Sequence, residues 1–225
     1  MYTAEMLESI KKVEATRAQR IGVEPRRMTA EEKDALLLSL GINVNLAPVC
    51  DISSDPSSFI YPRTLGQDAE TTSDYIRTVV GQMKSDGIGM VLKHFPGYGG
   101  SADTHTGQAL DPRPLSDFEK NDLLPFEAGI DAGAQAVLVS HNIVACLDAD
   151  YPASLSPAVH TLLRGRLGFD GVIMTDDLSM GAIKQFASGS SPAVMAVLAG
   201  NDLLLTADWK KEYANVLSAV NSGVI

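Results

Sequence analysis

Residues 88–107 read IGMVLKHFPGYGGSADTHTG, and this stretch sets the pattern for the whole chain. The apolar run from Ile88 to Leu92 is continuous, as in a parallel strand that is buried on both faces. Lys93 and His94 follow directly, and a proline and several glycines then break regular structure. Loops after buried strands commonly carry functional groups. The stretch therefore predicts a buried parallel strand that delivers polar side chains into a loop.

The same order of strand, loop and helix recurs along the chain. Apolar runs of strand length occupy residues 42–50, 88–95, 134–144, 171–175 and 201–208. Segments with helical periodicity or helix-capping residues occupy residues 3–20, 29–40, 70–86, 115–133, 156–167, 191–199 and 209–221. This alternation is typical of an α/β fold, either a doubly wound sheet or a (β/α) barrel.

The positions of the polar residues favour the barrel. Four predicted strands end in polar side chains: Asp51, Lys93 with His94, His141, and Asp176. In a barrel these strand ends point into one cup. Neither the GxGxxG nor the GxxxxGK[ST] nucleotide fingerprint follows any predicted strand. We therefore expect a (β/α)8 TIM-barrel type of fold that is incomplete at its N-terminus, because only five of about eight strands can be counted.

The composition narrows the classes of partner. The chain has 225 residues, and its 18 basic and 28 acidic residues give a net charge of −10. This charge argues against nucleic acid and against an anionic membrane surface. No apolar segment is long enough to span a bilayer, and the charged N-terminus has no signal-peptide core. As written, the chain is expected in the cytoplasm; if the natural N-terminus is missing, an extracellular location is the alternative.

The two cysteines are expected to be buried free thiols. Cys50 and Cys146 follow apolar runs, and neither belongs to a CxxC motif. We therefore expect no metal site.

Candidate catalytic groups occur in two places. Asp176 ends a predicted strand, where a carboxylate acts as a nucleophile or stabilises positive charge. The alternative is a helix cap, a role that we assign to its neighbour Asp177. Asp103 and His105 lie two residues apart in the glycine-rich loop, where a carboxylate tunes an imidazole for proton transfer. Their alternative is a solvated loop, because this spacing is common by chance.

Candidate ligand-binding groups are basic. Lys93 and His94 suit hydrogen bonds to a polyhydroxylated or anionic ligand, and the alternative is a strand-end salt bridge with a core histidine. Arg63 either clamps a ligand or pairs with Asp51 or Asp68.

Four segments together resemble the N-terminal catalytic domain of glycoside hydrolase family 3, in its β-N-acetylhexosaminidase branch. They are NLAPVCDI, KHFPGYG followed by DTH, LGFDGVIMTDDLSMGAI and AGNDLLL. The segments occur in the family's order, and the resemblance is strongest over residues 38–206. It implies a single catalytic domain over residues 1–225, in which residues 1–37 form a divergent helical segment.

The resemblance also implies an activity. Family members of this branch are retaining exo-glycosidases that release terminal β-linked N-acetylglucosamine from cell-wall muropeptides or chitooligosaccharides, without a cofactor. Asp176 matches their nucleophile, and Asp103 and His105 match their acid/base dyad. Lys93, His94 and Arg63 match residues that hold the sugar.

The sequence departs from the family in three respects. Two strands that family members place before residue 42 are missing, so the chain is either truncated or completed by another polypeptide, such as a second copy. Tyr98 stands where many relatives have histidine, and no second C-terminal domain follows. The alternative functions are a β-glucosidase or β-xylosidase of the same family, and a truncated, non-catalytic remnant.

Overall fold

The computed structural model describes residues 28–99, 104, 107–184, 186 and 191–225. The helix predicted over residues 3–20 lies outside these ranges, as do the candidate site residues Asp103 and His105.

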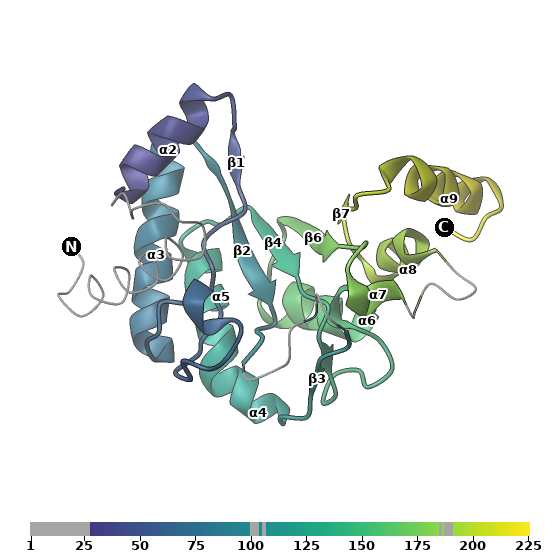
Figure 1. The fold of residues 1–225 in the computed structure, drawn as a ribbon, viewed down its shortest axis with the longest axis horizontal. Coiled ribbons are helices and arrows are strands. Elements are labelled where there is room, and N and C mark those ends of the chain that lie inside the picture. The colour runs from purple at the N-terminus through teal and green to yellow at the C-terminus, as the bar shows by residue number, and fades with distance from the viewer. Residues whose placement is uncertain (1–27, 100–103, 105–106, 185, 187–190) are drawn as a thin grey trace.

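A curled five-stranded parallel sheet forms the centre of the molecule (Figure 1). Its strands are β1 (Val44–Asn45), β2 (Gly89–Phe95), β4 (Ala136–Val139), β6 (Val172–Asp177) and β7 (Leu203–Leu205), and they lie side by side in that order. Each pair is parallel, and each strand joins next to the one before it. A doubly wound sheet reverses its strand order, so the predicted barrel type is confirmed in the form of a half-barrel.

Helices connect the strands. They are α2 (Ala30–Ser39), α3 (Ala69–Asp86), α4 (Leu115–Asp117), α5 (Leu123–Asp131), α6 (Pro157–Thr161), α7 (Gly181–Lys184), α8 (Pro192–Ala199) and α9 (Trp209–Asn221). A second, two-stranded parallel sheet pairs β3 (Leu110–Asp111) with β5 (Ile143–Val144). Thr29 and Glu32 form a capping box at the start of α2, and Gly87 ends α3 in the left-handed conformation with φ of 75°.

The helix predicted over residues 115–133 is interrupted. A π-helical segment, Phe118–Asp122, separates α4 from α5. Pro125 follows this segment and has no N–H to offer the carbonyl four residues earlier. The helix is therefore irregular on the N-terminal side of Pro125.

The two faces of the sheet have different partners. Alternate residues of β2, β4 and β6 pack with the helices in the main core, among them Leu92, Val137 and Ile173. Val91, Leu138 and Met174 form a separate small cluster on the other, concave face. Because side chains alternate along a strand, Lys93 and Asp176 follow Val91 and Met174 on this concave face.

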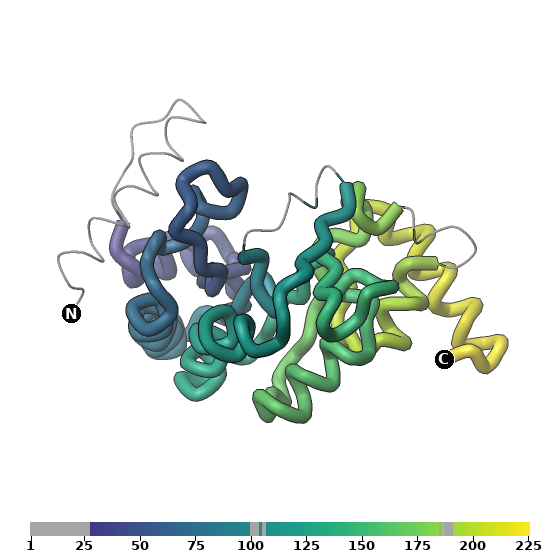
Figure 2. The backbone as a smooth tube through the Cα atoms, turned by 90° about the horizontal axis from the view of Figure 1, so that it is seen from below, coloured from purple at the N-terminus to yellow at the C-terminus, as the bar shows by residue number. Residues whose placement is uncertain are grey.

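The two end strands of the sheet are short and exposed. The strands predicted over residues 42–50 and 201–208 shrink to β1 and β7, because each has a partner on one side only. Val44 is 50% exposed and Leu203 is 43% exposed. The helices α2 and α9, which lie beyond these two strands, are at opposite ends of the molecule (Figures 1 and 2).

The expectation for the cysteines is half right. Both are free thiols, but Cys50 is buried whereas Cys146 is exposed. Cys146 follows the short edge strand β5 and lies in a turn that the core does not cover.

Asp34 provides a test of how α2 packs on α3. It is 1% exposed, and burial followed by the neighbouring Asp86 carboxylate raises its pKa above the usual 3.8. A raised folded-state pKa means that ionisation weakens the fold, so stability is lost as pH rises through that value. We expect Asp34→Asn to raise the Tm at pH 7 by about 2–4 °C, with a smaller gain near pH 4. Thermal unfolding followed by circular dichroism measures both values.

Asp74→Asn is the matched control on the exposed face of α3. Asp74 forms an exposed ion pair with Arg77 at 2.6 Å, and such pairs contribute little. Equal Tm changes in the two variants would contradict the role assigned to the buried Asp34 carboxyl group.

Candidate active site

Asp51 is the centre of a buried polar cluster at the carboxyl ends of β1 and β2. Its Oδ2 atom accepts a hydrogen bond from the His94 backbone N–H at 3.1 Å and lies 2.7 Å from His94 Nδ1. Its Oδ1 atom accepts from the Tyr98 backbone N–H at 2.9 Å. Asp51 and His94 are 1% and 2% exposed. A single carboxylate therefore holds the turn from His94 to Tyr98 in place.

The contact of Arg63 sets the hydrogen-bonding pattern of the His94 ring. An Arg63 Nη2 atom lies 3.0 Å from His94 Nε2. A guanidinium group has only donors, so Nε2 accepts from Arg63 and Nδ1 donates to Asp51. Of the two alternatives for Arg63, the ion pair with Asp51 or Asp68 is not found: Arg63 reaches Asp51 through His94, and Asp68 caps α3. The ligand clamp stays a prediction.

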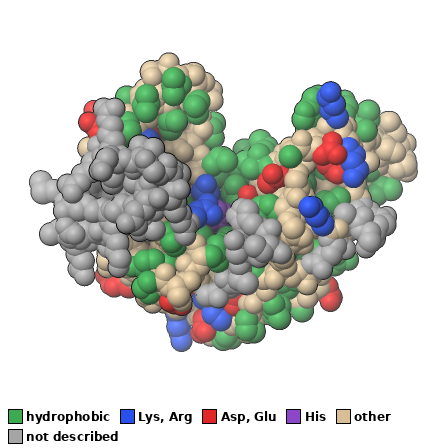
Figure 3. Space-filling view, viewed as in Figure 1, with side chains coloured by type: hydrophobic (Ala, Val, Ile, Leu, Met, Phe, Trp, Pro, Cys, Tyr) green, Lys and Arg blue, Asp and Glu red, His purple; other side chains and the backbone are tan. Residues whose placement is uncertain are grey.

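Asp176 and Lys93 come from different strands of the concave face. Both are half-buried. Asp176 Oδ1 accepts from the Asp177 backbone N–H at 2.9 Å, and Asp177 Oδ1 accepts from the Ser179 N–H at 2.9 Å. The Asp177 carboxylate therefore stabilises the turn after β6 and does not cap a helix as predicted, because α7 begins only at Gly181. Basic and histidine side chains gather at the floor of a hollow between the two ends of the molecule (Figure 3).

Tyr98 lies close to both the Asp51 cluster and Asp176, since both carboxylates affect the pKa of its phenol. Burial is the main reason that the pKa of its phenol is raised well above the usual 10.0; the hydrogen bond to Thr104 lowers this pKa, and the Asp176 and Asp51 carboxylates raise it further. The phenol is therefore protonated throughout the neutral range. Its hydroxyl lies 2.6 Å from Thr104 Oγ1.

The other predicted strand-end residue, His141, is turned toward the backbone of β6. Its Nδ1 atom lies 2.7 Å from Ser154 Oγ, and its Nε2 atom lies 3.0 Å from the Asp177 carbonyl oxygen. The carbonyl only accepts, so Nε2 carries the proton and Nδ1 accepts from Ser154. His141 therefore supports the end of β6.

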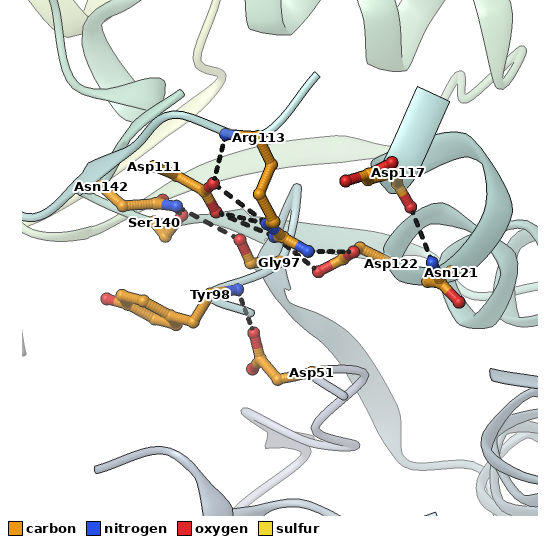
Figure 4. A network of polar contacts seen from close by, with 10 residues as sticks. All are labelled: Asp51, Gly97, Tyr98, Asp111, Arg113, Asp117, Asn121, Asp122, Ser140 and Asn142. Carbon is orange, nitrogen blue, oxygen red and sulfur yellow. Dashed lines mark hydrogen bonds and ion pairs between the residues drawn. The ribbon is translucent and has the colours of Figure 1, made fainter. Parts of the chain in front are cut away.

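A second polar cluster, the Arg113 cluster of Asp111, Arg113 and Asp122, supports the turn that follows β2 (Figure 4). Arg113 donates to Asp111 Oδ2 and to Asp122 Oδ2, at 2.8 Å in each case. A Cβ atom on Gly97 would lie 2.7 Å from Asp122 Oδ1, and one on Gly99 would lie 2.3 Å from Arg113 Nη2. The cluster thus packs directly against the glycine turn.

The charges of the Arg113 cluster are coupled. Burial by itself lowers the pKa of Arg113, but the hydrogen bonds and charges of Asp111 and Asp122 outweigh it and raise this pKa. Burial raises the pKa of Asp122, and Arg113 opposes that rise. The sequence analysis missed this cluster and missed the central role of Asp51. The only sequence signal was an arginine between acidic residues in the segment DPRPLSDFEKND.

Among the described residues, no group of three or more His, Cys, Asp or Glu side chains is placed to hold a metal ion. None of the described helices is both long and apolar enough to cross a membrane.

The chain has a parallel α/β half-barrel with polar groups at the carboxyl ends of its strands, and these features place it among the TIM-barrel-type proteins. The model of the glycosyl hydrolase family 3 N terminal domain matches residues 18–225, and the chain belongs to this family.

Solved structures agree with this assignment. A glycoside hydrolase family 3 beta-N-acetylglucosaminidase from Paenibacillus sp. str. FPU-7 aligns with a TM-score of 0.82 at 35% identity, over 87% of this chain and 39% of that chain. A beta-N-acetylhexosaminidase from Beutenbergia cavernae aligns with a TM-score of 0.76 at 30% identity, over 96% and 64% of the two chains.

Curated relatives carry a related name. A "Beta-hexosaminidase" of Xanthomonas campestris pv. campestris is 38% identical over 167 residues, which are 73% of this chain and 50% of the relative. A "Beta-hexosaminidase" of Stenotrophomonas maltophilia is 40% identical over 169 residues, which are 73% and 49% of the two chains. The chain therefore spans about half the length of the curated relatives that it matches.

Proposed function

We propose that this domain carries the active site of a retaining exo-glycosidase that releases terminal β-linked N-acetylglucosamine. The substrates are of the cell-wall muropeptide or chitooligosaccharide type, and no cofactor takes part. The observation that carries the proposal is the shared concave face on which Asp176 and Lys93 lie beside the Asp51–His94–Arg63 cluster. The names of the family's related proteins support the choice of sugar.

The chemistry uses two steps. Asp176 attacks the anomeric carbon while His105, oriented by Asp103, protonates the departing oxygen, so that a glycosyl–aspartate ester forms. His105 then takes a proton from water, the water oxygen attacks the same carbon, and the Asp176 carboxylate leaves. Two inversions at that carbon give net retention.

The basic residues bind the sugar. Lys93 presents an ammonium group on the concave face from β2, and β4 lies between this strand and β6, which carries the proposed nucleophile. Both ring nitrogens of His94 are engaged, so His94 acts by orienting Arg63. The guanidinium group of Arg63, with its five N–H donors, then holds the sugar hydroxyls or the N-acetyl group.

A panel of aryl β-glycosides tests the proposal with the 225-residue chain. We expect the aryl N-acetylglucosaminide to be hydrolysed about 100-fold faster than the glucoside or the xyloside, because a site built around an N-acetyl group rejects sugars that lack it. Faster cleavage of the glucoside or xyloside would assign the domain to another activity of the family.

The open edges β1 and β7 favour a second candidate, a non-catalytic sugar-binding domain that associates with a second copy of the chain. The same preparation distinguishes the two. Binding of N-acetylglucosamine by calorimetry without hydrolysis of any glycoside, with a dimer in sedimentation, supports the second candidate. Hydrolysis by the isolated chain removes it.

A further inference from the structure

Strand β6 continues beyond the ladder that joins it to β4. The last pair in that ladder is Val139 with Thr175, so the ladder stops one residue before Asp176. Backbone groups at the end of a strand then need other partners. The position of the Asp176 carboxylate therefore depends on contacts other than the β4 ladder.

The pairing of β6 with β7 is irregular at the same place. Met174 pairs with Leu203 and Asp177 pairs with Leu205, so β6 contains an extra residue between these two pairs. Such irregularities are over-represented next to active sites, where they change the direction of a side chain. Asp176 lies within this irregular stretch, and regular strand pairing does not fix it from the β7 side either.

His141 supplies a contact at this point from the end of β4. It lies just after β4 in the chain and is 1% exposed. Its Nε2–H donates to the Asp177 carbonyl oxygen at 3.0 Å, and the Asp177 N–H donates to Asp176 Oδ1 at 2.9 Å. The imidazole therefore holds the residue whose N–H holds the Asp176 carboxylate.

A buried serine fixes the direction of the His141 ring. The Nδ1 atom accepts from Ser154 Oγ at 2.7 Å, and Ser154 is 0% exposed. The Ser154 N–H donates to the Ser140 carbonyl oxygen at 2.9 Å, and the Ser154 carbonyl oxygen accepts from Asn201 Nδ2 at 2.8 Å. The polar groups of Ser154 are thus all engaged, and the imidazole is held on the side opposite Asp177.

We propose that His141 is a positioning residue that holds the Asp176 carboxylate in place for attack on the sugar. This inference rests on the proposed function, because only that function makes Asp176 a nucleophile. His141 acts through the backbone of Asp177 and does not need to touch the sugar. A displacement of about 1 Å in a reacting group can cost about 100-fold in rate. The rate of the chemical step should therefore depend on His141, whereas the affinity for the sugar should not.

His141→Asn and His141→Gln test this role as a pair. Glutamine places an amide N–H near the former Nε2 position, whereas asparagine is too short to donate to the Asp177 carbonyl oxygen. For His141→Asn we expect kcat with an aryl N-acetylglucosaminide to fall about 10–100-fold, while the inhibition constant of N-acetylglucosamine stays within about twofold. His141→Gln should recover to within about fivefold of the wild-type kcat. A His141→Gln variant as slow as His141→Asn would overturn the proposal.

His160→Asn is the matched control. His160 is a 4% exposed histidine of α6 whose Nδ1 atom lies 2.8 Å from the Ser156 carbonyl oxygen. Its substitution should leave kcat and the inhibition constant within about twofold, because no contact with the end of β6 is removed. Equal losses in His141→Asn and His160→Asn, or an inhibition constant that rises as far as kcat falls, would show a merely structural role and overturn the proposal.

Hydrogen exchange separates this inference from the proposed function. In His141→Asn we expect the Asp177 amide to exchange about tenfold faster than in the wild type, because its residue is no longer held at the carbonyl oxygen. This measurement does not need catalysis. Unchanged exchange at Asp177 in His141→Asn overturns the positioning role, whereas faster exchange in a chain that hydrolyses no glycoside leaves that role standing and rejects the proposed function.

Discussion

Asp176→Asn is expected to reduce kcat/KM for an aryl N-acetylglucosaminide by about 10⁴-fold. The amide has nearly the shape of the carboxylate and keeps an oxygen for the Asp177 N–H, but it neither attacks the anomeric carbon nor balances positive charge there. A loss of this size is about 5 kcal/mol of transition-state stabilisation. Initial rates at matched protein concentration, with circular dichroism to confirm folding, measure it.

Asp177→Asn is the control at the neighbouring position. Asp177 is also half-buried, and its Oδ1 accepts from Ser179, a role that an amide oxygen also fills. We expect this variant to stay within about tenfold of the wild type. Added azide, as an external nucleophile, should restore turnover to Asp176→Ala and leave Asp177→Asn unaffected. Wild-type activity in Asp176→Ala without azide would reject Asp176 as the nucleophile.

Arg113→Met is expected to lower the free energy of unfolding by about 3–5 kcal/mol at pH 7. Asp111 and Asp122 are each 2% exposed, and without Arg113 both carboxylates stay buried without their cation. Methionine fills part of the same volume over the Phe118 ring, which Arg113 covers at 4.3 Å. The loss therefore reports charge and hydrogen bonding more than packing. Urea unfolding curves of the two proteins give the difference.

The stability loss caused by Arg113→Met should also depend on pH. Burial raises the pKa of Asp122 even when Arg113 is present, and removing the cation raises it further. A raised folded-state pKa penalises the native state when the group ionises, so the deficit of Arg113→Met should shrink as pH falls toward about 4. Arg77→Met, which removes an exposed ion pair with Asp74, should cost less than about 1 kcal/mol. A deficit no larger than that control would contradict the buried-charge account.

Local patterns in the sequence predicted most of the fold. The continuous apolar runs at residues 88–95 and 171–175 are strands β2 and β6, because burial on both faces leaves no alternation. Gly87 ends α3 in the left-handed conformation, a signal that acts within a single turn. The N-cap Asp68 was considered only as a partner of Arg63, although its signal is equally local. Helices and strands that are determined by residues close together in the chain can therefore be predicted from the sequence.

Contacts between residues that are far apart in the chain could not be predicted from local sequence patterns. Asp51 and His94 are 43 positions apart, and no pattern in the sequence around either residue predicts their hydrogen bond. The Arg113 cluster exists only in the folded chain, where β3 and the π-helical segment bring its three charges together. The short β1 and β7 reflect missing neighbours rather than weak strand sequences. The roles of Asp103 and His105 stay predictions.

Strand order that follows chain order has a consequence for how the protein is made. During synthesis the strands emerge in the order in which they lie in the sheet, so the pairing of β1 with β2 involves no later segment. Asp51, Arg63 and His94 are therefore all translated before the codon for Asp176 is read. The growing chain contains the proposed sugar-binding residues first, and its proposed nucleophile follows about 80 residues later.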